Sequence, residues 1–333
     1  MALEQSSAIA SVVALPRFGA AVIALPPRVK HLRAEPGRLG WMRAAIALAF
    51  RHRFDAVFCG HLNAAPLAAA LARLRGKPLW LQAHGIEAWQ RPEIAVQRAV
   101  REARLVTAVS RYTRARLLAW SDIDPARVRV LPNTVAARFV RRARPEHLVA
   151  RHGLEGRRVV LTVGRLVADE RYKGHDRIIR AMPQVLRSVP EALYLVVGGG
   201  DDLPRLANIA REAGVVDKVA FAGSVAEDEL PLYFNVADVF AMPSTGEGFG
   251  IVFLEAARCG LPVIGGNKDG SVDALADGAV GTVLDPDDSH ALESALVAAL
   301  QAGLLAQPNA AVERFAVPHF AKHVDDLVRE YLA

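Results

Sequence analysis

The stretch Glu247-Gly248-Phe249-Gly250-Ile251-Val252-Phe253-Leu254-Glu255 places two carboxylates on either side of a Gly-Phe-Gly turn. The apolar run after the turn predicts a helix that opens near Ile251 and ends at Cys259-Gly260, with a strand at 261–264. The first N–H groups of a helix lack intrahelical partners and favour a phosphate. Carboxylates in the turn and inside the helix can accept hydrogen bonds from hydroxyls. The stretch therefore predicts a site for a ligand that carries both phosphate and hydroxyl groups.

Around this stretch, short apolar runs alternate with helical patterns along the whole chain. This alternation is typical of βαβ units, so the predicted fold class is α/β with parallel sheets. In the first half we expect strands at 11–15, 21–25, 56–59, 79–82, 105–109 and 128–131, and helices at 39–51, 64–75, 93–103 and 111–119. In the second half we expect strands at 159–163, 193–197, 218–221, 239–242, 263–265 and 281–283.

The length and the charge distribution both indicate two domains. A chain of 333 residues exceeds one typical domain. The charged and patternless stretch 141–158 is predicted to be the linker. Residues 1–150 contain 24 Lys and Arg and 9 Asp and Glu, so this half is basic. The residues after Ala150 contain 17 Lys and Arg and 26 Asp and Glu, so the second half is acidic. The basic half favours an anionic partner such as a membrane, a lipid diphosphate or a nucleic acid.

Arginines concentrate on the predicted helices of the basic half. They are Arg91, Arg98, Arg101, Arg104, Arg111, Arg114 and Arg116. A solvated helix face is one interpretation of this group, and attraction to an anionic membrane is the other. A nucleic-acid partner is disfavoured, because no recognisable binding module accompanies the charge.

Cysteine use and hydropathy bear on the compartment. Cys59 and Cys259 are far apart in the sequence and favour reduced core residues over a disulfide. No apolar run approaches the ~18 residues needed to span a bilayer, and Met1–Gln5 lacks the pattern of a signal peptide. We expect a cytoplasmic protein, with peripheral association at the inner face of a membrane as an open alternative.

The run from Ala237 to Ile264 resembles the E-x7-E motif of retaining glycosyltransferases of family 4, also called glycosyl transferases group 1. The resemblance implies the GT-B fold, in which two Rossmann-like domains face each other across a cleft. We expect an N-terminal acceptor-side domain over 1–145 and a C-terminal nucleotide-sugar-binding domain over 146–316. The C-terminal helix, within 317–333, should return to the N-terminal domain.

The start of the chain departs from the family pattern. Family members usually open with a strand, a glycine-rich loop and a long helix. Met1–Gln5 resembles the end of that helix, and the only glycine before Gly37 is Gly19. The first domain is therefore expected to lack its opening strand, loop and helix.

Gly164-Arg165 ends a predicted strand, and Lys173 follows eight residues after Arg165. Open α/β sheets bind ligands outside the carboxyl ends of their strands. Two cations there can hold a diphosphate and neutralise the charge that develops as it leaves. The resemblance assigns this role to Arg165 and Lys173, next to Gly164. The alternative is an ordinary surface ion pair.

The resemblance also assigns roles around the E-x7-E motif. It implies that Glu247 holds sugar hydroxyls and that Glu255 holds the ribose. Phe249, Gly250 and Ile251 would present backbone N–H groups to the sugar or phosphate. In the family, the loop that here contains Ser224 and Val225 holds the nucleotide base.

Four residues that follow first-half strands are candidate site residues, His84 for catalysis and the other three for the acceptor side. His84 ends the strand at 79–82, and the resemblance places a histidine there near the reacting sugar. The alternative for His84 is a capping or buried structural histidine. His61, Ser110 and Asn133 also follow strands and are weaker candidates.

No metal site is predicted. The triplets Asp122-Ile123-Asp124 and Asp285-Pro286-Asp287 resemble the D-x-D pairs of metal-dependent transferases of another fold. Both occur in turn-like contexts beside proline, and no Cys/His cluster has zinc spacing. We expect no cofactor other than a donor linked to GDP or UDP.

The resemblance implies a metal-independent, retaining hexosyltransferase. The donor would be a nucleoside-diphosphate sugar, and the acceptor a lipid-linked or growing glycan, as in polysaccharide biosynthesis. Two alternatives remain open. One is another GT-B enzyme, such as a nucleotide-sugar epimerase that acts by elimination. The other is a non-catalytic member that only binds nucleotide sugar.

Overall fold

The computed structural model describes residues 5–17, 27–32, 37–305 and 307–332 of the chain. It consists of two compact units. Unit 1 comprises residues 1–134 together with 317–333, and unit 2 comprises residues 135–316. Each unit is described by itself.

Unit 1 contains parallel strands covered by helices. The strands β1 (Val12–Ala14) and β2 (Val29–His31) pair with each other, and β3 (Val57–Cys59), β4 (Leu79–Ala83), β5 (Leu105–Ala108) and β6 (Val128–Val130) form a parallel sheet in that order. Its helices are α1 (Gly37–Arg51), α2 (Ala65–Arg75), α3 (Ile86–Trp89), α4 (Ile94–Glu102) and α5 (Arg111–Leu118). Strands β4 and β5 are entirely buried, as expected for central strands of a parallel sheet.

The C-terminal helix α13 (Val317–Tyr331) belongs to unit 1. Val324 and Leu327 pack against Trp80, Leu105 and Leu131 of the sheet and its following loop. Polar contacts hold the end of the helix: Arg129 pairs with Glu330 at 3.0 Å, and Arg104 donates to the carbonyl oxygen of Tyr331 at 3.2 Å. Apolar burial and these contacts thus fix the last helix on the first part of the chain.

Unit 2 contains a six-stranded parallel sheet in the order β12-β11-β10-β7-β8-β9. The strands are β7 (Arg158–Val163), β8 (Ala192–Val197), β9 (Val219–Gly223), β10 (Val239–Met242), β11 (Val263–Gly266) and β12 (Thr282–Leu284). The first strand of the unit lies in the middle, and the chain winds outward from it in both directions. This is the doubly wound Rossmann order, and its switch point lies between β7 and β10.

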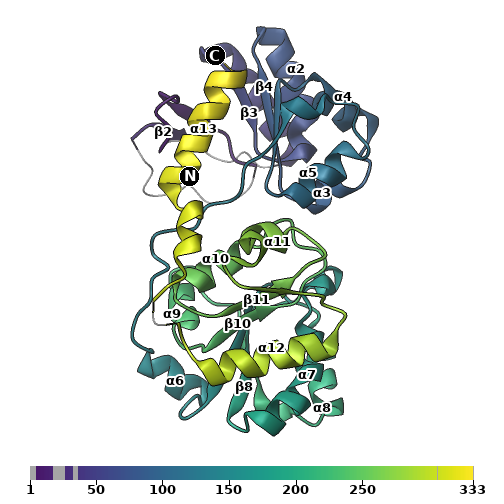
Figure 1. Ribbon diagram of the computed structural model, residues 1–333. Helices are drawn as coiled ribbons and strands as arrows, with labels where there is room; N and C mark the ends of the chain where they lie inside the picture. The colour runs from purple at the N-terminus through teal and green to yellow at the C-terminus, as the bar shows by residue number, and fades with distance from the viewer. Residues whose placement is uncertain (1–4, 18–26, 33–36, 306, 333) are drawn as a thin grey trace. The chain divides into compact units, whose positions relative to one another are not determined.

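Helices cover both faces of this sheet (Figure 1). One face is covered by α7 (His175–Ser188), α8 (Leu203–Glu212) and α12 (Ser289–Ala302), whose apolar residues share one core with β7 and β8. On the other side lie α9 (Leu230–Phe234), α10 (Ile251–Arg258) and α11 (Ser271–Ala274). The rings of Phe234 and Phe253, from α9 and α10, flank Phe240 of β10 at 5.8 and 5.7 Å.

The observed elements agree with most of the predicted ranges, and two regions need comment. The stretch 141–158 was predicted to be a linker, and this is wrong: it contains α6 (Glu146–His152) and the start of β7. Leu148 and Leu154 are buried, and most of the charged residues around them are exposed. The short helix α6 was therefore not predicted, because charged residues outnumber apolar ones in this stretch. The expected strand at 21–25 and the helix end at 1–4 lie outside the described residues.

Candidate functional site

The switch point of unit 2 brings two loops together. One loop follows β7 and carries Gly164 and Arg165, and the other follows β10 and runs through Pro243 to Gly250. Because parallel strands present their carboxyl ends at the same edge of the sheet, both loops open on that edge. Gly174 shows how closely the two segments approach. Its φ is +78°, and a Cβ there would lie 2.5 Å from the carbonyl oxygen of Pro243.

Three of the predicted residues meet at this edge in a chain of charges. Lys173 Nζ lies 2.6 Å from Glu247 Oε1 and 3.6 Å from Glu170 Oε2, and Arg165 pairs with the same Glu170. The side chains of Lys173, Glu170 and Glu247 are 11%, 12% and 15% exposed, whereas Arg165 is 74% exposed. The structure therefore links Arg165, Lys173 and Glu247 through Glu170, a residue that the sequence did not single out.

Tyr172 closes the inner side of this charge cluster. Its ring lies 5.2 Å from Lys173 Nζ, and its carbonyl oxygen accepts from the N–H of Thr245 at 2.9 Å. Burial, together with the carboxylates of Glu247 and Glu170, raises the pKa of Tyr172. The phenol thus remains neutral at physiological pH beside a cluster whose charges already balance.

A buried row of hydrogen bonds joins β7, β8 and β10 to His175 at the start of α7. Thr162 donates to the carbonyl oxygen of Ala241 at 2.5 Å, and Tyr194 donates to Thr162 at 2.9 Å. Because the Tyr194 hydroxyl donates its only proton to Thr162, it accepts a hydrogen bond from Nδ1 of His175, 3.2 Å away. Burial and the nearby Lys173 lower the pKa of His175 to about 4. The imidazole of His175 therefore remains neutral at physiological pH, close to the positive charge of Lys173.

Glu255 belongs to a second group of charges in unit 2. It lies in α10, and its charged neighbours are Arg138 and Glu227, which pair with each other. Burial raises the pKa of Glu255 to about 7, and Arg138 opposes this shift while Glu227 adds to it. The exposed Ser224 and half-buried Val225 follow β9, shortly before Glu227. The loop expected to hold the base therefore leads to the same group as Glu255.

The raised pKa of Glu255 predicts a pH-dependent stability. The unfolded carboxyl loses its proton near its ordinary pKa of 4.5, whereas the folded one keeps it up to about 7. The stabilisation is therefore present below the unfolded pKa and is lost as the pH rises through the folded value. As the pH rises from 5 to 8, wild type should therefore lose on the order of 2 kcal/mol of unfolding free energy through Glu255. Glu255→Gln, which has no proton to lose at this position, should not show this loss. Urea unfolding of both proteins at the two pH values checks this, and parallel pH profiles would refute it.

The opening of α10 has the predicted form. Gly250 is the N-cap with φ +83°, Ile251 is the first helical residue and is 37% exposed, and Glu247 lies in the preceding turn. Phe249 is 2% exposed, and its ring packs 5.8 Å from that of Phe315. The ring of Phe249 is therefore part of the core, and the role of its backbone N–H stays a prediction.

In unit 1, two histidines lie at the carboxyl edge of the four-stranded sheet. His84 follows β4 and its Nε2 lies 2.8 Å from the carbonyl oxygen of Gly60, while its backbone N–H donates to Glu87 at 2.6 Å. His61 follows β3, and its Nδ1 accepts from the N–H of Asn63 at 3.2 Å. The two rings are 6.4 Å apart, and both residues are exposed. The structure thus brings together the catalytic candidate His84 and the acceptor-side candidate His61.

The other two candidates, Ser110 and Asn133, are less exposed than the histidines. Ser110 is fully buried and caps α5: it accepts from the N–H of Thr113 at 3.0 Å and donates to its hydroxyl oxygen at 3.1 Å. The expectation that Ser110 lines the acceptor side is therefore wrong, because helix capping already explains the serine. Asn133 is half-buried and follows β6 in the last part of unit 1 before the boundary.

The arginines of the basic half are held by internal contacts. Arg104, Arg114 and Arg116 donate to backbone carbonyl oxygens of Tyr331, Val128 and Trp89. Arg101 instead pairs with Asp122 at 3.0 Å. Because carbonyl oxygens carry no net charge, these contacts leave the positive charge of Arg104, Arg114 and Arg116 in place on unit 1.

The two D-x-D triplets have protein partners. Asp124 caps the 3-10 turn at Pro125–Arg127. Asp285 and Asp287 each lie 2.6 Å from Lys268 Nζ, and Arg177 also pairs with Asp287 at 2.7 Å. These contacts lower the pKa values of both carboxyls.

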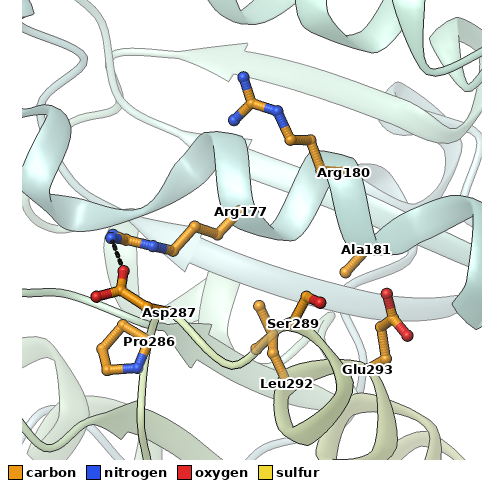
Figure 2. Close-up of a pocket in the computed structure, with 8 residues that line it drawn as sticks. All are labelled: Arg177, Arg180, Ala181, Pro286, Asp287, Ser289, Leu292 and Glu293. Carbon is orange, nitrogen blue, oxygen red and sulfur yellow. Dashed lines mark hydrogen bonds and ion pairs between the residues drawn. The ribbon is translucent and has the colours of Figure 1, made fainter.

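A separate cavity of about 220 Å³ lies beside the second triplet, between α7 and the start of α12 (Figure 2). Arg177 and Arg180 line it from α7, and Asp287 and Ser289 line it from the other side. Arg177 turns toward Asp287 and Arg180 pairs with Asp176. The cations of this cavity pair with carboxylates of the protein, as do those of the charge cluster around Lys173. We prefer the charge cluster as the candidate site because it lies at the switch point between β7 and β10, where open α/β sheets bind ligands.

Among the described residues, no helix combines the length and the apolar character needed to cross a bilayer.

Two family profiles match the chain, one over most of each unit. Residues 146–313 match the sequence profile of the family described as glycosyl transferases group 1, and residues 8–139 match the profile of glycosyltransferase family 4. The chain therefore belongs to the group 1, family 4 glycosyltransferases.

Two curated relatives are similar to this chain over most of its length. The chain is 37% identical over 278 residues to a GDP-mannose-dependent alpha-(1-6)-phosphatidylinositol monomannoside mannosyltransferase of Mycolicibacterium smegmatis, covering 78% of this chain and 69% of the relative. It is 40% identical over 262 residues to the protein of the same description from Mycobacterium tuberculosis, covering 73% of this chain and 65% of the relative. The chain thus spans about two thirds of the length of these relatives.

Solved structures show the fold. The HepE protein of Anabaena in complex with UDP-glucose superposes with a TM-score of 0.76 at 21% identity, covering 91% of this chain and 86% of that one. Sucrose-phosphate synthase from Thermosynechococcus elongatus gives a TM-score of 0.73 at 22% identity, covering 94% and 86%. The GT-B class with two Rossmann-like domains, expected from the E-x7-E motif, is therefore confirmed.

Proposed function

We propose that this chain is a retaining, metal-independent hexosyltransferase that moves a sugar from a nucleoside diphosphate to a lipid-linked acceptor. One observation carries the proposal. At the switch point of unit 2, Arg165, Lys173 and Glu247 form one connected cluster on the loops that follow β7 and β10. Groups of this kind, gathered where an open α/β sheet binds ligands, favour a ligand that has both a diphosphate and hydroxyl groups.

Each residue has a part in the proposed transfer. Arg165 and Lys173 bind the diphosphate and stabilise the charge that grows on it as the bond from the anomeric carbon to the phosphate oxygen breaks. Glu247 accepts hydrogen bonds from sugar hydroxyls, and Glu255 accepts them from the ribose. The acceptor hydroxyl bonds to the anomeric carbon on the face that the diphosphate leaves, and its proton goes to the departing phosphate oxygen. The anomeric configuration is thereby retained.

The relatives indicate the substrates to test first. Two of them are described as GDP-mannose-dependent enzymes that act on a mannosylated phosphatidylinositol. We therefore propose GDP-mannose as the donor, ahead of a UDP-linked sugar, and a phosphatidylinositol mannoside as the acceptor, ahead of a polysaccharide.

The acceptor side is assigned to unit 1. His61 and His84 are exposed at the carboxyl edge of its sheet, where they can contact acceptor hydroxyls. The arginines that donate to carbonyl oxygens leave positive charge on the surface of unit 1. Such charge favours peripheral binding at the anionic inner face of a membrane, where a lipid-linked acceptor resides.

A transfer assay tests the proposal. The chain is incubated with radiolabelled GDP-mannose and vesicles that contain phosphatidylinositol monomannoside, with and without EDTA, and the new linkage is identified by NMR. We expect an α-linked product formed at the same rate in EDTA, because fixed cations and a helix N-terminus replace the metal at the diphosphate. Activity that is lost in EDTA and restored by manganese would contradict the metal-independent mechanism.

Control reactions separate the alternatives. The same incubation is run without acceptor and, in parallel, with UDP-glucose and with a soluble mannan. Release of an epimerised sugar without acceptor would favour an epimerase that acts by elimination. Tight binding of nucleotide without turnover in any arm would favour a non-catalytic member of the family. A β-linked product would rule out retention.

A further inference from the structure

A buried carboxylate outside the predicted site holds the backbone of Glu247. Asp269 is 2% exposed and lies between β11 and α11. Its Oδ2 accepts from the N–H of Glu247 at 2.7 Å and from the hydroxyl of Ser244 at 2.8 Å. Its Oδ1 accepts from the N–H of Ser271 at 2.8 Å. The three donors come from two different loops, so this one side chain ties the loops together.

The next residue completes the connection. The N–H of Gly270 donates to the carbonyl oxygen of Glu247 at 2.8 Å. Both backbone polar groups of Glu247 are therefore bonded to the consecutive residues 269 and 270. On the outer side of the same loop, Lys268 lies 2.6 Å from both Asp285 and Asp287. The segment 268–270 is thus anchored on two sides and offers a fixed support for the turn that carries Glu247.

From these contacts we infer that Asp269 is a positioning residue of the donor site. It sets where the Glu247 carboxylate lies relative to Lys173 without touching the ligand itself. This inference rests on the proposed function, in which Glu247 holds the sugar. Arg165 and Lys173, which bind the diphosphate in that proposal, come from the segment after β7, whereas the three donors to Asp269 come from the segments after β10 and β11. The contribution of Asp269 is therefore expected in turnover more than in affinity for the nucleotide.

Asp269→Asn is the variant that tests this with the least change in shape. An amide has one acceptor oxygen and one NH2 group. Whichever way it turns, the NH2 group faces a backbone N–H, either that of Glu247 or that of Ser271. One of the two loops is then released from the support.

Asp238→Asn is the matched control. Asp238 is 6% exposed in the same unit and its Oδ2 accepts from the N–H of Val159 at 2.7 Å. It directly precedes β10, so it lies at the amino end of the strands, away from the switch point. Both substitutions replace a buried acceptor by an amide, and only one of them is next to Glu247. Ser244→Ala, which removes a single donor to Asp269, is a milder second variant in case Asp269→Asn does not fold.

The first measurement needs no ligand. Hydrogen exchange of the backbone amides at 244–248 and of Ser271 is followed in all variants. In Asp269→Asn we expect the amide that loses its acceptor, that of Glu247 or that of Ser271, to exchange at least tenfold faster. The increase should be smaller in Ser244→Ala and absent in Asp238→Asn. Unchanged exchange in both Asp269→Asn and Ser244→Ala would overturn the inference, whatever the activity of the protein.

The second measurement compares kcat for transfer from GDP-mannose with the dissociation constant of GDP. We expect kcat to fall at least tenfold in Asp269→Asn while the GDP dissociation constant changes less than threefold, and neither value to change in Asp238→Asn. Equal losses of kcat and GDP affinity, or equal effects in both aspartate variants, would show a merely structural role. If wild type neither binds GDP nor transfers mannose, the proposed function fails, and the exchange rates still decide whether Asp269 positions Glu247.

Discussion

Replacing Lys173 by alanine is expected to lower the affinity for GDP by ~10- to 100-fold, since a hydrogen bond to a charged group contributes about 1.5–3 kcal/mol. Transfer should fall further, by ~10²–10³-fold in kcat/KM, because the ammonium also stabilises charge on the leaving diphosphate. The substitution leaves Glu247 and Glu170, which are 15% and 12% exposed, without the cation that lies between them. Isothermal titration with GDP and initial-rate kinetics measure the two effects.

Arg171→Ala provides the control for Lys173. Arg171 belongs to the same short segment, but it pairs with Asp202 at 3.0 Å, away from the cluster. Its removal changes the net charge of the protein by the same amount. We expect GDP affinity close to wild type in this variant. If Lys173→Ala and Arg171→Ala bound GDP equally well, the assignment of the diphosphate to Lys173 would be wrong.

Replacing Gly270 by alanine is expected to cost about 3 kcal/mol of stability, at the upper end of the range for overpacked sites. The φ at this position is −68°, so the backbone itself accepts any residue. A Cβ there would, however, lie 2.0 Å from the carbonyl oxygen of Gly248 and 2.9 Å from that of Glu247. Backbone atoms cannot rotate away as a side chain does, so the turn that carries Glu247 must shift. Urea unfolding measures the loss.

Gly214→Ala is the reference for that measurement. Gly214 has φ +68° and open space around its would-be Cβ. Alanine there meets only the strain of the left-handed conformation, about 1 kcal/mol. The collision at Gly270 should therefore cost more than the strain at Gly214, although a Ramachandran argument alone predicts the opposite. Similar losses at the two positions would mean that the contact between the loops is not as close as described.

The helix and the strand that position the site could be predicted from the local sequence. The helix that opens near Ile251 and ends at Cys259-Gly260 was predicted from one apolar run between two glycine turns, and α10 spans Ile251–Arg258 with Cys259 as its C-cap. The position of Arg165 after a buried strand was likewise predicted from the apolar run at 159–163, which is β7. Both patterns depend on neighbours within a few residues, so a single sequence contains the information.

The ion pairs and hydrogen bonds between side chains of the site could not be predicted in this way. Glu170 bridges Arg165 and Lys173, yet in the sequence it is one acid among several charged residues at 169–173. Asp269 bonds to Glu247, 22 positions earlier. No periodicity links such positions, because their meeting depends on the order of the strands. The group of Glu255, Arg138 and Glu227 was missed for the same reason.

A nucleotide sugar is expected to bind unit 2 at the switch point between β7 and β10. The most direct measurement is a crystal structure of the chain with GDP-mannose bound, compared with one of Lys173→Ala under the same conditions. We expect the diphosphate within hydrogen-bond distance of Arg165 and Lys173, the mannose hydroxyls on Glu247 and the ribose on Glu255, and a vacant site in the variant. A nucleotide found instead in the cavity between α7 and α12, or anywhere in unit 1, would contradict the account.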